Sequence, residues 1–81
     1  MNNEKIYKYL AFEFKALRIK QNLSLNELAQ IACLSVNTIR KVETGNYKFH
    51  LFTFYKLCKA FKINHCEIIK RAEKQMKKRH P

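Results

Sequence analysis

Apolar residues recur every three or four positions along most of the chain, which is the spacing of helices that bury one face. The first such stripe consists of Ile6, Leu10, Phe14 and Leu17. The predicted helices cover residues 5–21, 24–32, 35–43, 51–61 and 65–77. The chain has one Gly, and its one Pro is the last residue, so a β fold rich in hairpins is disfavoured. The pattern therefore predicts one all-α domain of five helices joined by short connections.

Signals for helix ends support these boundaries. Ser24 followed by Glu27 forms a capping box, in which each side chain accepts a hydrogen bond from the other residue's backbone N–H. Asn64 and Glu67 repeat this pattern before the fifth helix. Gly45 follows the third helix, at the position where helices commonly end with a residue in the left-handed conformation. The residues expected to face inward on the second and fourth helices are Leu28, Ile31, Ala32, Leu51, Phe54, Leu57, Cys58 and Phe61.

The second and third predicted helices are short and nearly contiguous, so they must cross steeply and touch through small residues. The expected contact set consists of Leu28, Ala29, Ala32, Leu34, Ile39 and Val42. The two alanines allow the two helices to approach closely, and the larger apolar residues fill the space between them. This is the packing of a helix-turn-helix, centred on residues 25–44. A generic helical hairpin with small residues at its crossing shares part of the pattern.

The excess of basic over acidic residues indicates what kind of molecule the protein binds. Seventeen Lys and Arg residues stand against six Glu and no Asp, which gives a formal charge of +11 and a pI near 9.9. Such an excess on so small a domain is typical of proteins that bind a polyanion. Nucleic acid is the leading candidate. An anionic membrane surface, an acidic protein and simple solvation of a Lys-rich surface are the alternatives, and charge alone cannot choose among them.

An ordered set of short motifs is more specific. It runs Leu17-Arg18, Leu23-Ser24, Glu27-Leu28-Ala29, Leu34-Ser35, Thr38-Ile39, Val42-Glu43-x-Gly45 and Leu57-Cys58-Lys59-Ala60-Phe61. From Leu17 to Ile69 the chain resembles the XRE family of lambda-repressor-like helix-turn-helix domains. The resemblance implies a five-helix all-α fold whose third helix enters the major groove of double-stranded DNA. We therefore expect a DNA-binding domain over residues 1–73 and a basic C-terminal tail over 74–81.

The resemblance also implies which residues meet DNA. The base-contacting positions would be Val36, Asn37, Arg40 and Lys41, at the start of the third helix. The residues that resemble phosphate contacts are Ser24, Thr38, Asn46, Tyr47 and Lys48, with the free N–H groups of the second helix beside them. Chemistry agrees for two of these residues, since Asn37 can pair with adenine and Lys41 can donate to guanine; for Val36 the interpretation is packing on a thymine methyl. The alternative is an ordinary solvated helix face.

One further pair of residues has a structural assignment in the family. An Arg of the first helix commonly pairs there with the Glu that ends the third helix, and this sequence retains both as Arg18 and Glu43. We therefore expect an ion pair that fixes the third helix against the first.

The sequence also departs from the family pattern. Leu25 stands where a phosphate-contacting Gln is usual, Cys33 stands where the turn often has Gly, and Phe49 replaces the usual loop Pro. A residue with a side chain at a left-handed turn costs roughly 1–2 kcal/mol. The loop becomes rich in aromatic residues, so Phe49 and Phe52 would either form a dimer surface or cover the small core.

The sequence contains few of the patterns that are typical of enzymes. The chain has no paired carboxylates, no Gly-rich phosphate loop and no metal-ligand spacing, and His50, His65 and His80 are scattered. We expect no catalytic residue, no cofactor and no metal. The three cysteines form no CxxC pair, and the chain has no signal peptide and no long apolar run. We expect structural thiols, no membrane association, and a cytoplasmic, nucleoid-associated protein of a bacterium or phage.

These observations predict a sequence-specific transcriptional regulator of double-stranded DNA, with repression as the family-level expectation. We expect a homodimer on a palindromic operator, because two copies can read half-sites about one helical turn apart. The alternative is an antitoxin or adaptor whose main partner is another protein and for which DNA binding is secondary. Its contact surface would be the aromatic loop and the apolar side of the fifth helix, including Met76. Sequence-blind binding to DNA or RNA is a third hypothesis.

Overall fold

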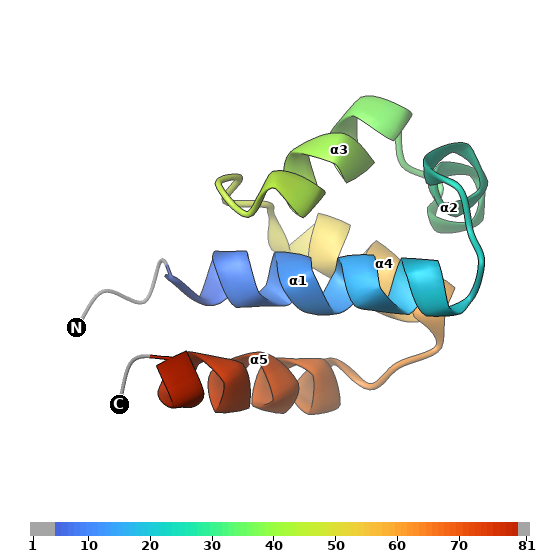
Figure 1. Cartoon of the computed structure of the whole chain (residues 1–81). Coiled ribbons are helices and arrows are strands. Elements are labelled where there is room, and N and C mark those ends of the chain that lie inside the picture. The colour runs from blue at the N-terminus through green and yellow to red at the C-terminus, as the bar shows by residue number, and fades with distance from the viewer. Residues whose placement is uncertain (1–4, 80–81) are drawn as a thin grey trace.

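The computed structural model of the chain describes residues 5–79, and within that range all regular structure is helical (Figure 1). The helices are α1 (Lys5–Lys20), α2 (Leu25–Ala32), α3 (Val36–Thr44), α4 (Leu51–Phe61) and α5 (His65–Arg79). Helix α1 is central and packs against α3, α4 and α5, while α2 packs against α3 and α4. In Figure 1, α5 runs antiparallel to α1 on one side, and α3 lies on the other. The five-helix prediction is confirmed.

Side-chain caps define the helix ends near the helix-turn-helix. The Glu27 N–H donates to Ser24 Oγ at 3.0 Å, and the Ser24 N–H donates to the Glu27 carboxylate at 2.8 Å, so the predicted capping box is present. The Thr38 N–H donates to Ser35 Oγ at 3.1 Å and caps α3. Gly45 closes α3 in the left-handed conformation, with a φ of +82°. Strong local signals thus fix both ends of α3.

Between residues 5 and 79, three residues other than glycine also adopt the left-handed conformation. Asn22, Cys33 and Lys62 follow the ends of α1, α2 and α4, each with a φ of 56°. Cys33 takes this conformation in the turn between α2 and α3, as expected, and its N–H donates to backbone carbonyls of α2. The side chain at this position strains the backbone, because a left-handed residue places Cβ close to the carbonyl oxygen.

The core joins the helix-turn-helix to an aromatic cluster. Its fully buried large side chains are Phe14, Leu28, Ile39, Val42, Leu57 and Ile68. The predicted helix-turn-helix contacts belong to it, with Leu34 partly buried and the other five residues buried. Phe14 stacks on Phe61 with ring centroids 6.0 Å apart and meets Phe49 and Phe54 edge-on. Phe49 is buried in this cluster, so the expectation that it forms a dimer surface is wrong and the alternative that it covers the core holds.

Several other expectations about side-chain placement are also wrong. Ile31 and Leu51 were expected to face inward, but both are exposed. Ile31 lies off the inward face of α2, which consists of the buried Leu28, Ala29 and Ala32. Leu51 is the first residue of α4, and the buried residues of that helix begin at Phe54. The second capping box is incomplete. Asn64 Oδ1 accepts from the Cys66 N–H at 2.8 Å, but the Glu67 carboxylate accepts from Arg71 at 2.9 Å.

The cysteines divide into two kinds. Cys58 is buried on the apolar face of α4, and burial raises the pKa of its thiol to about 11. It is therefore a structural residue, as expected. Cys33 and Cys66 are exposed, so the expectation of structural thiols does not extend to them.

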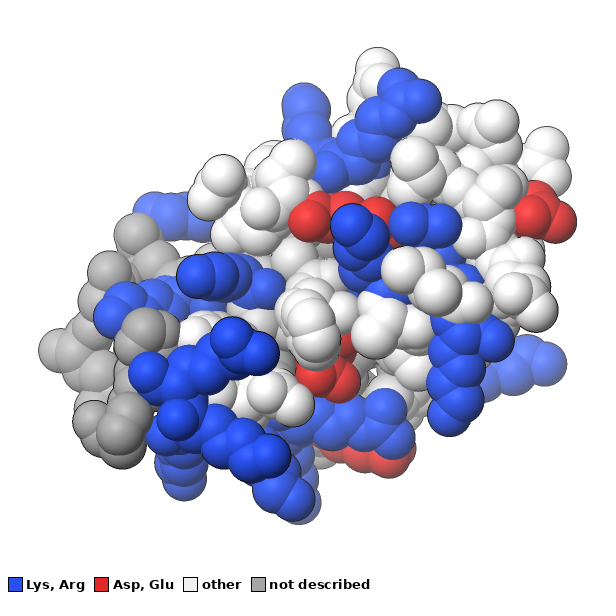
Figure 2. Space-filling model, viewed as in Figure 1, with Lys and Arg blue, Asp and Glu red and all other residues white. Residues whose placement is uncertain are grey.

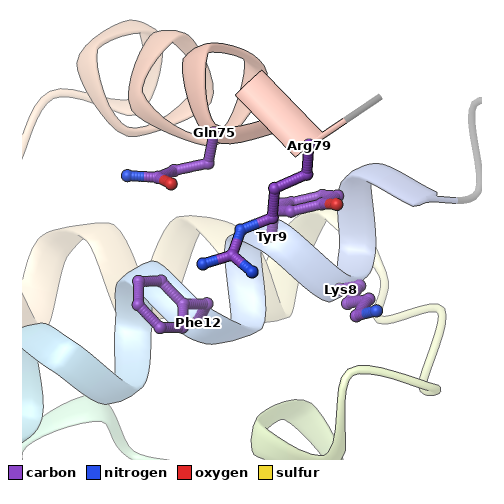
Figure 3. A pocket seen from close by; sticks show the side chains of 5 residues that line it. All are labelled: Lys8, Tyr9, Phe12, Gln75 and Arg79. Atoms are coloured by element: carbon purple, nitrogen blue, oxygen red, sulfur yellow. The ribbon is translucent and has the colours of Figure 1, made fainter. Parts of the chain in front are cut away.

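The segment expected to be a basic tail is largely helical. Helix α5 continues through Arg79, and Met76 packs against the core. Gln75 and Arg79 of α5 extend toward α1 near Tyr9 and Phe12 (Figure 3). These four residues and Lys8 line a hollow of about 150 Å³. The fifth helix, predicted to end near residue 77, thus extends two residues further and includes most of the segment assigned to the tail. His80 and Pro81, also placed in the tail, lie outside the described residues.

Candidate nucleic-acid interface

The outward face of α3 carries three hydrogen-bonding side chains. Asn37, Arg40 and Lys41 are exposed and stand at positions i, i+3 and i+4, so they share one side of the helix. Ile39 and Val42, on the opposite side, are buried in the core. Val36 is partly buried at the start of the helix. The structure thus brings three of the four expected base-contacting residues together at the surface.

An ion pair anchors the C-terminal end of α3. Arg18 donates from Nε to Glu43 Oε2 at 2.7 Å and from Nη2 to Oε1 at 3.2 Å, while Nη1 donates to the Leu23 carbonyl at 2.9 Å. The two charged side chains are only 15% and 11% exposed. The hydrogen bonds that Arg18 donates to Glu43 raise the pKa of Arg18 above its ordinary value. The predicted pair is present. Together with the bond to Leu23, it connects α1, α3 and the loop between α1 and α2.

The N-terminus of α2 is less open to a phosphate than the sequence indicates. The Glu27 carboxylate already accepts the Ser24 N–H, and this hydrogen bond lowers the pKa of Glu27 below its ordinary value. An anion bound at this helix end would therefore lie near a carboxylate. The Ser24 hydroxyl is exposed and can still donate.

The N-terminus of α3 has a different character, because its first turn contains no acidic residue. Ser35 Oγ and Thr38 Oγ1 lie 2.8 Å apart there, and Ser35 is exposed while Thr38 is partly buried. A helix N-terminus presents backbone N–H groups and the positive end of the helix dipole. Ser35, which the sequence indicated only as a cap, thus lies beside Thr38 at the end of α3 that suits an anion.

The loop after α3 lies beside the outward face of that helix. Asn46 and Lys48 are exposed, whereas Tyr47 is partly buried against the core. The Lys41 ammonium lies 5.7 Å from the centre of the Tyr47 ring, close enough for a cation–π contact. Thr44 Oγ1 donates to the Lys41 carbonyl and accepts from the Asn46 N–H at 3.2 Å. A residue expected to read bases and the loop expected to hold phosphate are therefore physically connected.

Basic side chains are distributed unevenly over the surface. Figure 2 shows Lys and Arg over the α3 side and, more densely, where α5 ends beside the start of α1. On α3, the acidic residue Glu43 is neutralised by Arg18, which leaves Arg40 and Lys41 as an excess of positive charge. Among residues 5–79, no cluster of three His, Cys or acidic side chains could hold a metal ion. No described helix is both long and apolar enough to cross a membrane.

Comparisons with known proteins agree with this geometry. Two crystal structures of the clp gene regulator ClgR from Corynebacterium glutamicum resemble the chain in fold, both at 18% sequence identity. The first has a TM-score of 0.83, and its alignment covers 91% of this chain and 79% of the ClgR chain. The second has a TM-score of 0.78, and its alignment covers 88% of this chain and 92% of the ClgR chain. No curated protein sequence matches. A family model described as helix-turn-helix matches residues 14–68, a span that contains α2, α3 and α4. The chain therefore belongs to the XRE family of helix-turn-helix proteins, and its α2 and α3 form the helix-turn-helix of a five-helix, lambda-repressor-like DNA-binding domain.

Proposed function

We propose that this protein regulates transcription by binding a specific operator in double-stranded DNA, with α3 in the major groove. The observation that carries the proposal is the exposed face of α3, where Asn37, Arg40 and Lys41 point away from the core. Caps at both ends and the Arg18–Glu43 pair hold that face in a fixed orientation. Membership of a helix-turn-helix family supports DNA as the ligand.

Each group of residues has a proposed role. Asn37 pairs with adenine, Lys41 and Arg40 donate to guanine, and Val36 packs on a thymine methyl. The proposed phosphate contacts are the Ser24 hydroxyl, Thr38 at the start of α3, and Asn46, Tyr47 and Lys48 in the loop. Contacts to phosphate set the position of the protein on DNA, whereas contacts to bases give the sequence preference.

We infer that two copies act together on a palindromic site and repress transcription by occupying it. One recognition helix reads only a few base pairs, and a dimer reads two half-sites about one helical turn apart. Of the two aromatic residues expected at a dimer surface, Phe49 is in the core, and Phe52 is exposed beside three lysines with no carboxylate among them, so we assign neither residue to the contact between the two copies.

Selection of the purified protein on random duplex DNA, at about 150 mM salt, tests this function directly, since surface charges are screened beyond roughly 8 Å under these conditions. We expect enrichment of a palindrome with two half-sites. A single enriched half-site would keep the reading by α3 and remove the dimer. If no sequence were enriched, binding would be sequence-blind or secondary, and the proposed function would fail.

The basic end of α5 is expected to contribute little direct contact with DNA bound by α3, because α1 lies between these helices (Figure 1). Replacing Lys74, Lys77, Lys78 and Arg79 by Gln should therefore change the slope of log K against log salt by less than about one, the contribution of a single phosphate contact. Substitution is preferable to truncation because Met76 packs against the core.

The matched control for this experiment is Lys48→Gln in the loop after α3, which should reduce the slope by about 0.9 through loss of one phosphate contact. A reduction of about three or more in the α5 variant would instead show that the basic end of this helix contacts the DNA backbone.

A further inference from the structure

A second surface carries exposed apolar side chains bordered by lysines. Ile31 of α2 and Phe52 and Tyr55 of α4 are 53%, 64% and 52% exposed. They line a hollow of about 430 Å³ between the end of α2 and the outer side of α4, a volume within the roughly 300–1,000 Å³ of sites that take up ligands. We define the α2/α4 face by Ile31, Phe52, Tyr55, Lys56, Lys59 and Lys62. Contiguous exposed apolar groups with a polar rim commonly mark an interaction site.

The side chains of this face contact one another. The rings of Phe52 and Tyr55 are nearly parallel, with an interplanar angle of 8° and centroids 6.3 Å apart. The Lys56 ammonium lies 4.5 Å from the centre of the Phe52 ring and donates to the Cys33 carbonyl at 3.2 Å. The Lys59 ammonium lies 6.0 Å from the centre of the Tyr55 ring. A surface ordered before binding loses less conformational freedom when a partner docks.

The charge of the α2/α4 face determines the chemistry of its partner. Three lysines line the hollow, and none of its described lining residues is acidic. A complementary surface must combine apolar side chains, which fill the hollow, with carboxylates, which meet the ammonium groups. An amphipathic helix with acidic flanks has this composition and fits an apolar groove through residues at i, i+3, i+4 and i+7. We propose that the α2/α4 face is a docking site for an acidic amphipathic helix of another protein.

Two other occupants fit the face less well. A second copy of this chain, related by a two-fold axis, would bring Lys56, Lys59 and Lys62 toward their counterparts with no carboxylate in the hollow to offset them. A nucleic acid would satisfy the lysines but would leave the apolar hollow beside Ile31 unfilled. The hollow is lined by no described residue of α3 or of the loop after it, so the face is separate from the surface proposed to read DNA. The regulator could thus hold its operator and a partner together.

The two exposed cysteines provide a direct test. Cys33 lines the hollow and Cys66 lies at the start of α5, so Cys66 serves as an internal control for alkylation by N-ethylmaleimide. The probe is a synthetic helical peptide with Leu and Phe at i, i+3, i+4 and i+7 and Glu elsewhere; its control carries Gln in place of Glu. At a concentration about ten times its Kd, the acidic peptide should slow alkylation of Cys33 about tenfold and leave Cys66 unchanged. The control peptide should not protect Cys33 at the same concentration.

Matched variants locate the binding site. Phe52→Ala and Tyr55→Ala should each weaken peptide binding about tenfold in fluorescence anisotropy, whereas Phe12→Ala, at an equally exposed position on α1, should not. Lys59→Gln should weaken binding severalfold, and Lys74→Gln on α5 should leave it unchanged. Because the substituted residues are exposed, each variant should keep its melting temperature, which is measured alongside.

Four results would overturn the proposal. Equal protection of both cysteines, or peptide affinity that does not respond to Phe52→Ala, would show that the peptide does not bind in the hollow. Sedimentation as a dimer that Phe52→Ala dissociates would assign the face to a second copy. Protection of Cys33 by a single-stranded oligonucleotide but not by the peptide would assign it to nucleic acid. Duplex DNA binding by the same variants is measured separately, so failure of this site is distinguishable from failure of the proposed function.

Discussion

Replacement of Glu43 by alanine is expected to reduce the free energy of unfolding by about 3 kcal/mol or more, because it leaves the mostly buried Arg18 guanidinium without its counter-charge. Two hydrogen bonds to the carboxylate would be lost, and only the bond to the Leu23 carbonyl would remain. In a domain of this size each kcal/mol corresponds to roughly 4–8 °C in melting temperature. Circular dichroism melting, combined with urea unfolding at low temperature, measures the effect.

The ion pair on α5 offers a matched control. Arg71 and Glu67 also form a short contact, 2.9 Å, but their side chains are 48% and 54% exposed. Glu67→Ala should therefore cost only about 0.5 kcal/mol or less, the usual contribution of an exposed pair one helical turn apart. Similar melting temperatures for the Glu43→Ala and Glu67→Ala proteins would contradict the assignment of a structural role to the Arg18–Glu43 pair.

Asn37→Ala and Lys41→Ala are each expected to reduce discrimination between the selected operator and a scrambled duplex by about 1–3 kcal/mol, since each removes a pair of hydrogen bonds to one base. That range corresponds to roughly 5- to 150-fold in the ratio of Kd values. Lys41→Ala should also weaken binding to the scrambled duplex, because it removes a charge and the contact with Tyr47. Asn37→Ala should leave that binding nearly unchanged.

The measurement is Kd for both duplexes at fixed salt, with Lys70→Ala on α5 as the control for loss of one lysine. Both residues on α3 are exposed, so the melting temperature should be retained and the change attributed to recognition. An unchanged ratio of Kd values in both α3 variants would place base recognition elsewhere on the molecule.

Local signals in the sequence were sufficient to predict where α2 begins and where α3 begins and ends. The Ser24–Glu27 box, the Ser35 cap and the left-handed Gly45 involve residues within a few positions of one another, so their interactions follow from helix geometry. The same geometry predicts that Asn37 and Lys41 lie on one face. The Arg18–Glu43 pair spans 25 positions and was predicted from the family resemblance, because no local pattern links these residues.

Features that depend on tertiary packing were not predictable in this way. Whether Ile31 or Phe49 is covered depends on which other helix reaches it, and periodicity within one helix carries no such information. Glu67 was predicted to accept the Asn64 N–H, but its carboxylate accepts from Arg71, one turn further along the same helix. The proximity of Lys41 to Tyr47 and the hollow between α2 and α4 both arise where separate elements meet.

The antiparallel pairing of α1 with α5 links the timing of synthesis to DNA binding. Helix α5 contributes Ile68 and Ala72, both fully buried, to the core that also supports α3. A nascent chain whose α5 is still inside the ribosome has therefore made the complete recognition helix but lacks part of the core that holds it in place. Because a domain folds cooperatively as a unit, such a chain should not yet bind DNA. Competence to bind DNA is therefore expected to appear in one step, when α5 docks on α1.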